Sequence, residues 1–73
     1  MEELTDRQRE ILDFINEFRE KNQCNPTMRE IADNFGMSSA NGAYEHLASM
    51  AKKGVIRLIS NKARGYLVNE AWM

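Results

Sequence analysis

The middle of this 73-residue chain contains two successive segments with helix signals, separated by a glycine-containing turn. The letters T-M-R-E at 27–30 have the form of a capping box, in which the first and last side chains bond each other's backbone N–H groups. Gly36 ends the first segment, and the second begins near two serines and ends at Gly54, where a left-handed residue commonly stops a helix. Any corner between two helices can use glycine in this way, but a short helix, such a turn and a longer helix form the helix-turn-helix arrangement. The pattern predicts helices at about 28–35 and 40–53.

The longer of these segments has two faces of different chemistry. Apolar residues recur at helical spacing on one face: Ala43, Leu47, Met50 and Ala51. The other face is chemically varied and carries Asn41, Tyr44, Glu45, Ala48 and Lys52. We expect the first face to pack on the protein core and the second to remain available to a ligand. Our hypothesis is that the second face enters the major groove of DNA.

A further helix is expected before these two, at about 6–22. Thr5 and Gln8 have the spacing of a capping box at its start. Apolar residues then follow at helical spacing and make one stripe: Ile11, Leu12, Ile15 and Phe18. Because the remaining positions are mostly charged, we interpret this helix as scaffold with a solvated outer face.

After Gly54 the pattern changes to short runs rich in β-branched residues. V-I-R-L-I-S at 55–60 and G-Y-L-V-N at 65–69 are typical of two strands, and the turn between them carries Lys62 and Arg64. Since an isolated two-stranded hairpin is marginal in water, its apolar residues are expected to lean on the helices.

The predicted fold class is therefore α+β, a three-helix winged helix-turn-helix with a C-terminal two-stranded antiparallel β-hairpin wing at about 55–69. We expect residues 1–73 to form a single domain. Trp72 and Met73 follow the wing, and this end is expected to fray unless Trp72 docks on the body or on another chain. The same two residues are a candidate patch for self-association.

The total charge, net −1 from ten basic and eleven acidic residues, does not mark a nucleic-acid-binding protein. Its distribution is more informative, because residues 1–36 hold nine acids and five bases whereas residues 37–73 hold two acids and five bases. The asymmetry fits one face that meets a polyanion, and equally fits a scatter of solvated charges. A single cysteine and the lack of a long apolar run favour a reducing, cytoplasmic location near the nucleoid, with no membrane partner.

Catalysis and metal binding have little support in the sequence. His46 is the only histidine, and its helical neighbours do not form a proton relay, so we interpret it as packed or interfacial. Cys24 has no basic neighbour nearer than Lys21, which argues against an activated thiolate. No Gly-rich phosphate loop, HExxH motif or acidic metal cluster occurs. We expect no enzyme activity, catalytic residue, metal, cofactor or small-molecule ligand.

DNA binding has a better physical case, because the N-terminal part of the second helix in a helix-turn-helix faces base edges. The amide of Asn41 can pair with adenine, Glu45 can accept from cytosine, and Ser39 can bond a base or a phosphate. Tyr44 can stack on a sugar or meet a thymine methyl group. The expected phosphate contacts are the cations of this half of the chain: Lys52, Lys53, Lys62 and Arg64.

Several of these residues also have a purely structural interpretation. Ser39 can be the N-cap of the helix, and Asn41 can be a turn residue. Lys52 and Lys53 can complement the helix dipole at its C-terminus.

Four motifs along about residues 4–68 add a family resemblance: L-T-D-R-Q-R-E-I-L-D-F-I, N-P-T-M-R-E-I-A, S-S-A-N-G-A-Y-E-H-L and A-K-K-G-V-I-R-L-I-S followed by A-R-G. Together they resemble the DNA-binding domain of the LexA family of SOS-response repressors. The resemblance implies a winged helix-turn-helix that binds a palindromic operator in double-stranded DNA as a homodimer. It implies base contacts at Ser39, Asn41, Gly42, Tyr44 and Glu45, with Lys52 and Lys53 near the DNA backbone.

The chain departs from the family near the start of the predicted 40–53 helix. The family usually has proline where Ala40 stands, alanine at the position of Gly42 and glutamate where Tyr44 stands, so the operator sequence is not carried over. These 73 residues also lack the family's C-terminal domain, with its Ala-Gly cleavage site, Ser-Lys catalytic pair and main dimer interface. Self-cleavage is therefore not carried over either.

The leading hypothesis is a sequence-specific duplex-DNA-binding transcriptional regulator, a repressor, with its third helix in the major groove and its wing on the backbone. The alternative is a winged-helix protein-interaction module, an antagonist or co-regulator, that does not itself bind DNA. The acidic first helix and Tyr44 favour this alternative. A third interpretation is an excised domain of a longer self-cleaving repressor.

Overall fold

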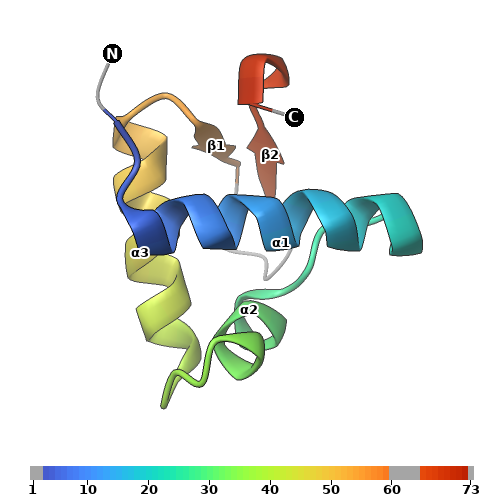
Figure 1. The fold of residues 1–73 in the computed structure, drawn as a ribbon, viewed down its shortest axis with the longest axis vertical. Coiled ribbons are helices and arrows are strands. Elements are labelled where there is room, and N and C mark those ends of the chain that lie inside the picture. Colours follow the sequence, from blue (N-terminus) through green and yellow to red (C-terminus); the bar gives the residue numbers. More distant parts are fainter. Residues whose placement is uncertain (1–2, 60–64, 73) are drawn as a thin grey trace.

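The computed structural model describes residues 3–59 and 65–72. Within them lie three α-helices, two strands and a short 3₁₀ helix: α1 (Asp6–Asn22), α2 (Met28–Asn34), α3 (Ala40–Lys52), β1 (Ile56–Leu58), β2 (Tyr66–Val68) and η1 (Glu70–Trp72). Figure 1 shows α1 lying across the molecule, with α3 crossing its N-terminal end and the two strands above it in this view. Three helices followed by an antiparallel hairpin confirm the predicted fold class, a winged helix-turn-helix.

Both predicted capping boxes are present. The backbone N–H of Gln8 donates to Thr5 Oγ1 and that of Thr5 to Gln8 Oε1, each at 3.1 Å. At the start of α2, Glu30 N donates to Thr27 Oγ1 at 3.0 Å and Thr27 N to Glu30 Oε1 at 2.8 Å. Each box satisfies N–H groups that have no partner inside the helix, so α1 and α2 begin where the sequence places their caps.

The helix ends depend on left-handed residues. Gly36 has φ +68° and Gly54 has φ +80°, the region that favours glycine. After each glycine, the N–H of the next residue (Met37 or Val55) donates to the carbonyl five positions back, at 2.8 and 3.0 Å. This bond satisfies a carbonyl that the helix leaves open. At the end of α1, Gln23 takes the same conformation with φ 62°, which its residue type does not signal.

The hydrophobic core draws on all three helices and the hairpin. Its buried members are Leu4, Ile11, Leu12, Ile15, Ile31, Ala32, Ala43, Leu47, Met50, Val55, Ile56, Tyr66 and Val68. Tyr66 is the largest of them at 1% exposure, and its hydroxyl donates to Pro26 O at 2.6 Å. A strand residue therefore reaches the loop before α2, which joins the hairpin to the helical part of the molecule.

The hairpin leans on the helices as predicted. Its register pairs Ile56 with Val68, Arg57 with Leu67, and Leu58 with Tyr66. Side chains alternate across the sheet, so Tyr66 and Val68 are buried while Leu67 is 50% exposed. One face of the two-stranded sheet thus completes the core.

The C-terminal residues dock on the body of the protein. Trp72 is half-buried against the core, and Asn16 Nδ2 of α1 donates to its carbonyl oxygen at 3.1 Å. Within η1, Trp72 N donates to Asn69 O at 2.8 Å. We expect this end to fray unless Trp72 docks, and Trp72 does dock on the body. Met73 lies outside the described residues.

Candidate nucleic-acid interface

The two faces of α3 differ in burial as their chemistry predicts. Ala43, Leu47 and Met50 are fully buried. The opposite side is exposed at Asn41, Tyr44, Glu45 and Lys52, with Ala48 half-buried. We call these five residues, together with Ser39, Ala40 and Gly42, the reading face. Its residues are exposed or half-buried, on a helix whose other side packs in the core.

The helix-turn-helix unit positions this face. Ile31 and Ala32 of α2 are completely buried, and α2 packs more extensively against α3 than against α1. The turn between the two helices, 35–39, includes the left-handed Gly36. As Figure 1 shows, α2 lies beside the N-terminal end of α3, so this end projects from the body.

Ser39 occupies the N-cap position of α3 but makes no capping hydrogen bond with its side chain. Its backbone is extended, with φ −151° and ψ 160°, and its carbonyl accepts from Gly42 N at 3.2 Å. The exposed hydroxyl is therefore not used at this helix start, in contrast to Thr5 and Thr27. This observation weakens the capping interpretation of Ser39 and leaves the hydroxyl available to a ligand.

Gly42 lies half-buried in the first turn of α3. A Cβ atom added there would lie 3.4 Å from Met37 Sδ, an ordinary van der Waals distance. No steric contact therefore requires glycine at this position, and an alanine fits without movement of the chain.

Comparison with known proteins adds independent information. The model of the LexA DNA-binding domain family matches residues 1–65. The chain belongs to the LexA DNA-binding domain family. It is 48% identical over 65 residues to the LexA repressor of Thiobacillus denitrificans, covering 89% of this chain and 32% of that protein. It is 50% identical over 62 residues to the LexA repressor of Leptothrix cholodnii, covering 85% and 27%. These matches confirm the resemblance seen in the four motifs.

The match concerns one part of those proteins. The LexA repressor of Azoarcus, 46% identical over 70 residues, aligns with 96% of this chain but with 35% of its own length. The chain thus spans about a third of the length of the curated relatives that it matches. The family model covers the three helices and β1, and it ends before β2.

Within this LexA-type domain, the two lysines at the end of α3 lie in different surroundings. Lys52 is exposed on the reading face. The half-buried Lys53 turns toward the start of α1, where its Nζ donates to Gln8 Oε1 at 2.7 Å and to Glu3 O at 3.0 Å. An ammonium group held by two protein oxygens is less available to a phosphate than a free one. The role of Lys53 at the DNA backbone stays a prediction.

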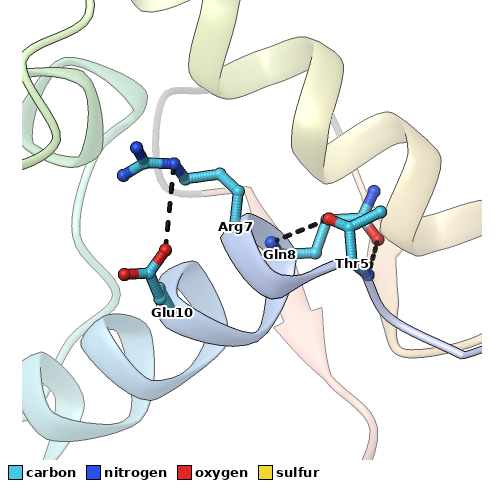
Figure 2. A network of polar contacts seen from close by, with 4 residues as sticks. All are labelled: Thr5, Arg7, Gln8 and Glu10. Carbon is cyan, nitrogen blue, oxygen red and sulfur yellow. Dashed lines mark hydrogen bonds and ion pairs between the residues drawn. The ribbon is translucent and has the colours of Figure 1, made fainter.

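Gln8 has a second role beyond the capping box that the sequence predicts. Figure 2 shows its reciprocal bonds with Thr5, beside the 3.9 Å ion pair of Arg7 and Glu10. Its Nε2 also donates to Ser49 Oγ of α3 at 3.0 Å, and the whole residue is only 4% exposed. One side chain thus caps α1 and joins it to α3. Sequence spacing reveals the first function, whereas the second depends on how the helices cross.

The hairpin contributes one described cation to the surface. Arg57 is exposed on β1, opposite Leu67. The sequence reasoning did not single it out as a DNA contact, although its alternation with buried Ile56 and half-buried Leu58 signals an outward side chain. Lys62 and Arg64, the predicted phosphate contacts of the wing, lie outside the described residues.

The outer face of α1 is an acidic ridge. Its members are spaced four, three, four and three positions apart, and all are exposed: Asp6, Glu10, Asp13, Glu17 and Glu20. This spacing places all five on one side of the helix. From the sequence the first helix is recognisable as acidic, but the alignment of its acids along one side is not among the predictions. The ridge disfavours contact between this side of α1 and any polyanion.

His46 is half-buried and lines an open depression between α3 and the start of α1, together with Gln8, Met37, Gly42, Glu45 and Ser49.

Across residues 3–59 and 65–72, no three His, Cys, Asp or Glu side chains gather in a way that could hold a metal ion. In the same ranges, no helix has the length and apolar character to cross a membrane.

Proposed function

We propose that this protein is a sequence-specific transcriptional repressor that binds duplex DNA with α3 in the major groove and the hairpin on the backbone. The observation that carries the proposal is the reading face, where Asn41, Glu45 and Lys52 are exposed on a helix whose opposite side is buried in the core. The family, described by its DNA-binding domain, supports the same conclusion. Groove binding by the second helix of a helix-turn-helix needs such an exposed face on a helix packed against the body.

The proposed base contacts are the N-terminal part of the reading face: Ser39, Asn41, Gly42, Tyr44 and Glu45. Asn41 offers an amide to adenine and Glu45 a carboxylate to the amino group of cytosine. Ser39 offers its hydroxyl, which makes no capping bond at the helix start. Gly42, which has no side chain, allows the helix backbone to approach the DNA closely. The proposed phosphate contacts are Lys52, Lys53, Lys62 and Arg64.

The salt dependence of duplex binding tests the proposal. If four cations each meet one phosphate, the logarithm of the binding constant should fall with the logarithm of salt concentration with a slope of roughly −3 to −4 per monomer. We expect Lys52→Gln to reduce the magnitude of this slope by about one. Lys53→Gln is the matched comparison. If it changes the slope less than Lys52→Gln does, the ammonium group of Lys53 stays bonded to Gln8 in the complex with DNA. Duplex binding that is absent or insensitive to salt would overturn the proposal.

We further propose that two copies bind a palindromic operator, since two-fold symmetric sites match symmetric protein dimers. Native mass spectrometry should detect one copy on a duplex with one half-site and two copies on a duplex with both. A single copy on the two-site duplex would contradict the dimer.

The acidic ridge favours a second candidate function, a protein-interaction module that uses α1. Two variants distinguish this candidate from DNA binding. One is Asn41→Ala, and the other is a double variant of α1, Asp13→Asn with Glu17→Gln. Under the DNA-binding proposal, Asn41→Ala weakens duplex retention and the α1 double variant does not. Under the alternative, only the α1 variant has an effect: it weakens the protein complex that the wild type forms in the source cells.

A further inference from the structure

Tyr44 is an exposed aromatic residue at the centre of the reading face. Three large apolar residues in the described part of the chain are markedly exposed, and Tyr44, at 48%, is the one that lies on a helix. No described residue makes a hydrogen bond with its hydroxyl or a ring contact with its side chain. About half of this side chain is therefore open to solvent on the outer side of α3.

The residues one helical turn on either side of Tyr44 are both alanines. Ala40 and Ala48 precede and follow it by four positions, and residues at this spacing have Cβ atoms about 5–6 Å apart. Both alanines are half-buried. Ala40, Tyr44 and Ala48 thus form a stripe of two methyl groups and a ring along α3, which we call the apolar stripe. The polar side chains of Asn41 and Glu45 lie beside it.

An apolar surface in the major groove has one favourable partner among the base edges. Thymine presents a methyl group at C5 there, whereas guanine, adenine and cytosine have no methyl group and are distinguished by their donors and acceptors. Covering a donor or acceptor with an apolar group removes its water without replacing the hydrogen bond. Contact with the thymine methyl group instead buries apolar surface on both sides.

From this geometry, and resting on the proposed function, we propose that the apolar stripe makes Tyr44 a specificity-determining residue that selects a thymine in the bound DNA. Asn41 and Glu45 read hydrogen-bonding edges next to it. The substrate class is then a duplex in which at least one position of each half-site requires the 5-methyl group.

The test compares thymine with uracil, which lacks only this methyl group. Duplexes that the wild-type protein selects from random sequences are synthesised with deoxyuridine at one thymine at a time, and their affinities are measured. We expect one position per half-site at which uracil weakens binding about fourfold, the factor that corresponds to one buried methyl group. Tyr44→Phe should keep this discrimination and Tyr44→Ala should lose it. Leu67→Ala, which shortens an equally exposed apolar residue on the hairpin, should keep it.

Each other outcome has a defined meaning. Binding by the wild type with no effect of uracil at any position overturns this inference and leaves the proposed function intact. So does a Tyr44→Ala variant that retains the discrimination, or one that binds all duplexes more weakly by the same factor, as stacking on a sugar would produce. Failure of the wild type to bind any duplex overturns the proposed function and this inference together. Circular dichroism of Tyr44→Ala establishes that the exposed substitution leaves the fold unchanged.

Discussion

Gln8 connects the start of α1 to the end of α3 with a single carboxamide. Its oxygen accepts from Thr5 N and Lys53 Nζ, and its nitrogen donates to Ser49 Oγ. Replacing it with alanine removes the shared partner of all three groups. We expect Gln8→Ala to lower the free energy of unfolding by about 1–3 kcal/mol, the range for buried polar groups that lose their partners. Urea unfolding followed by circular dichroism measures this change.

Asn22→Ala is the matched control for Gln8→Ala. Asn22 also donates an amide hydrogen bond, to Phe18 O at 3.0 Å, but this bond is exposed to solvent. Its loss should change the free energy of unfolding by less than about 0.5 kcal/mol, as is usual for surface substitutions. Equal effects of the two variants would contradict the connecting role of Gln8.

Gly42 and Gly36 should respond oppositely to alanine. At Gly42 the helix accepts a Cβ in normal contact with Met37, so Gly42→Ala should raise the free energy of unfolding by about 0.5–1 kcal/mol. At Gly36 there is also open space, but φ is +68°, so Gly36→Ala should destabilise the protein by about 1–2 kcal/mol through backbone strain. Thermal unfolding of both variants checks the pair. A stabilising Gly36→Ala would show that the left-handed turn is not needed.

At the scale of the element, the starts of α2 and α3 are built differently. Thr27 caps α2 through its side chain, whereas Ser39 makes no such bond at α3. We expect Thr27→Ala to lower the free energy of unfolding by about 1 kcal/mol and Ser39→Ala to change it little. Under the proposed function, Ser39→Ala should instead weaken duplex binding. Chemical denaturation and a duplex titration on both variants separate the two effects, and a marked loss of stability in Ser39→Ala would restore its role as a cap.

The elements could be predicted because their signals are local. Two capping boxes and the glycines at 36 and 54 mark the ends of helices within a few residues of sequence, and alternation marks the strands. The hydrogen-bond partner of Lys53 could not be predicted in this way, because the sequence places Lys53 simply beside Lys52 at the end of α3. Its actual partner, Gln8, lies 45 positions earlier and becomes a neighbour only when α1 and α3 cross. The docking of η1 on α1 depends on a tertiary contact in the same manner.

For the whole molecule, Tyr66 is the residue that joins the hairpin to the helices. Its hydroxyl, in a fully buried ring, donates to Pro26 O, so Tyr66→Phe leaves a buried carbonyl without this donor. We expect a loss of about 1–3 kcal/mol in the free energy of unfolding. Tyr44→Phe removes a hydroxyl from an exposed ring and is the matched control, with an expected change near zero. Denaturant unfolding of both variants decides the matter, and a neutral Tyr66→Phe would contradict the role of this bond.

The two ends of α3 give the molecule an uneven resistance to local opening. Its last turn is secured by Lys53 on Gln8 and by Val55 N on Met50 O, while its first turn has no side-chain cap. Amide hydrogen exchange should therefore be fast in the first turn and slow in the last two, because protection follows the free energy of local opening. Mass spectrometry with and without a bound duplex measures this gradient. The first turn, which carries Asn41 and Gly42 of the proposed base contacts, would then gain order from the DNA that it reads, so part of the binding free energy would be spent on ordering this turn.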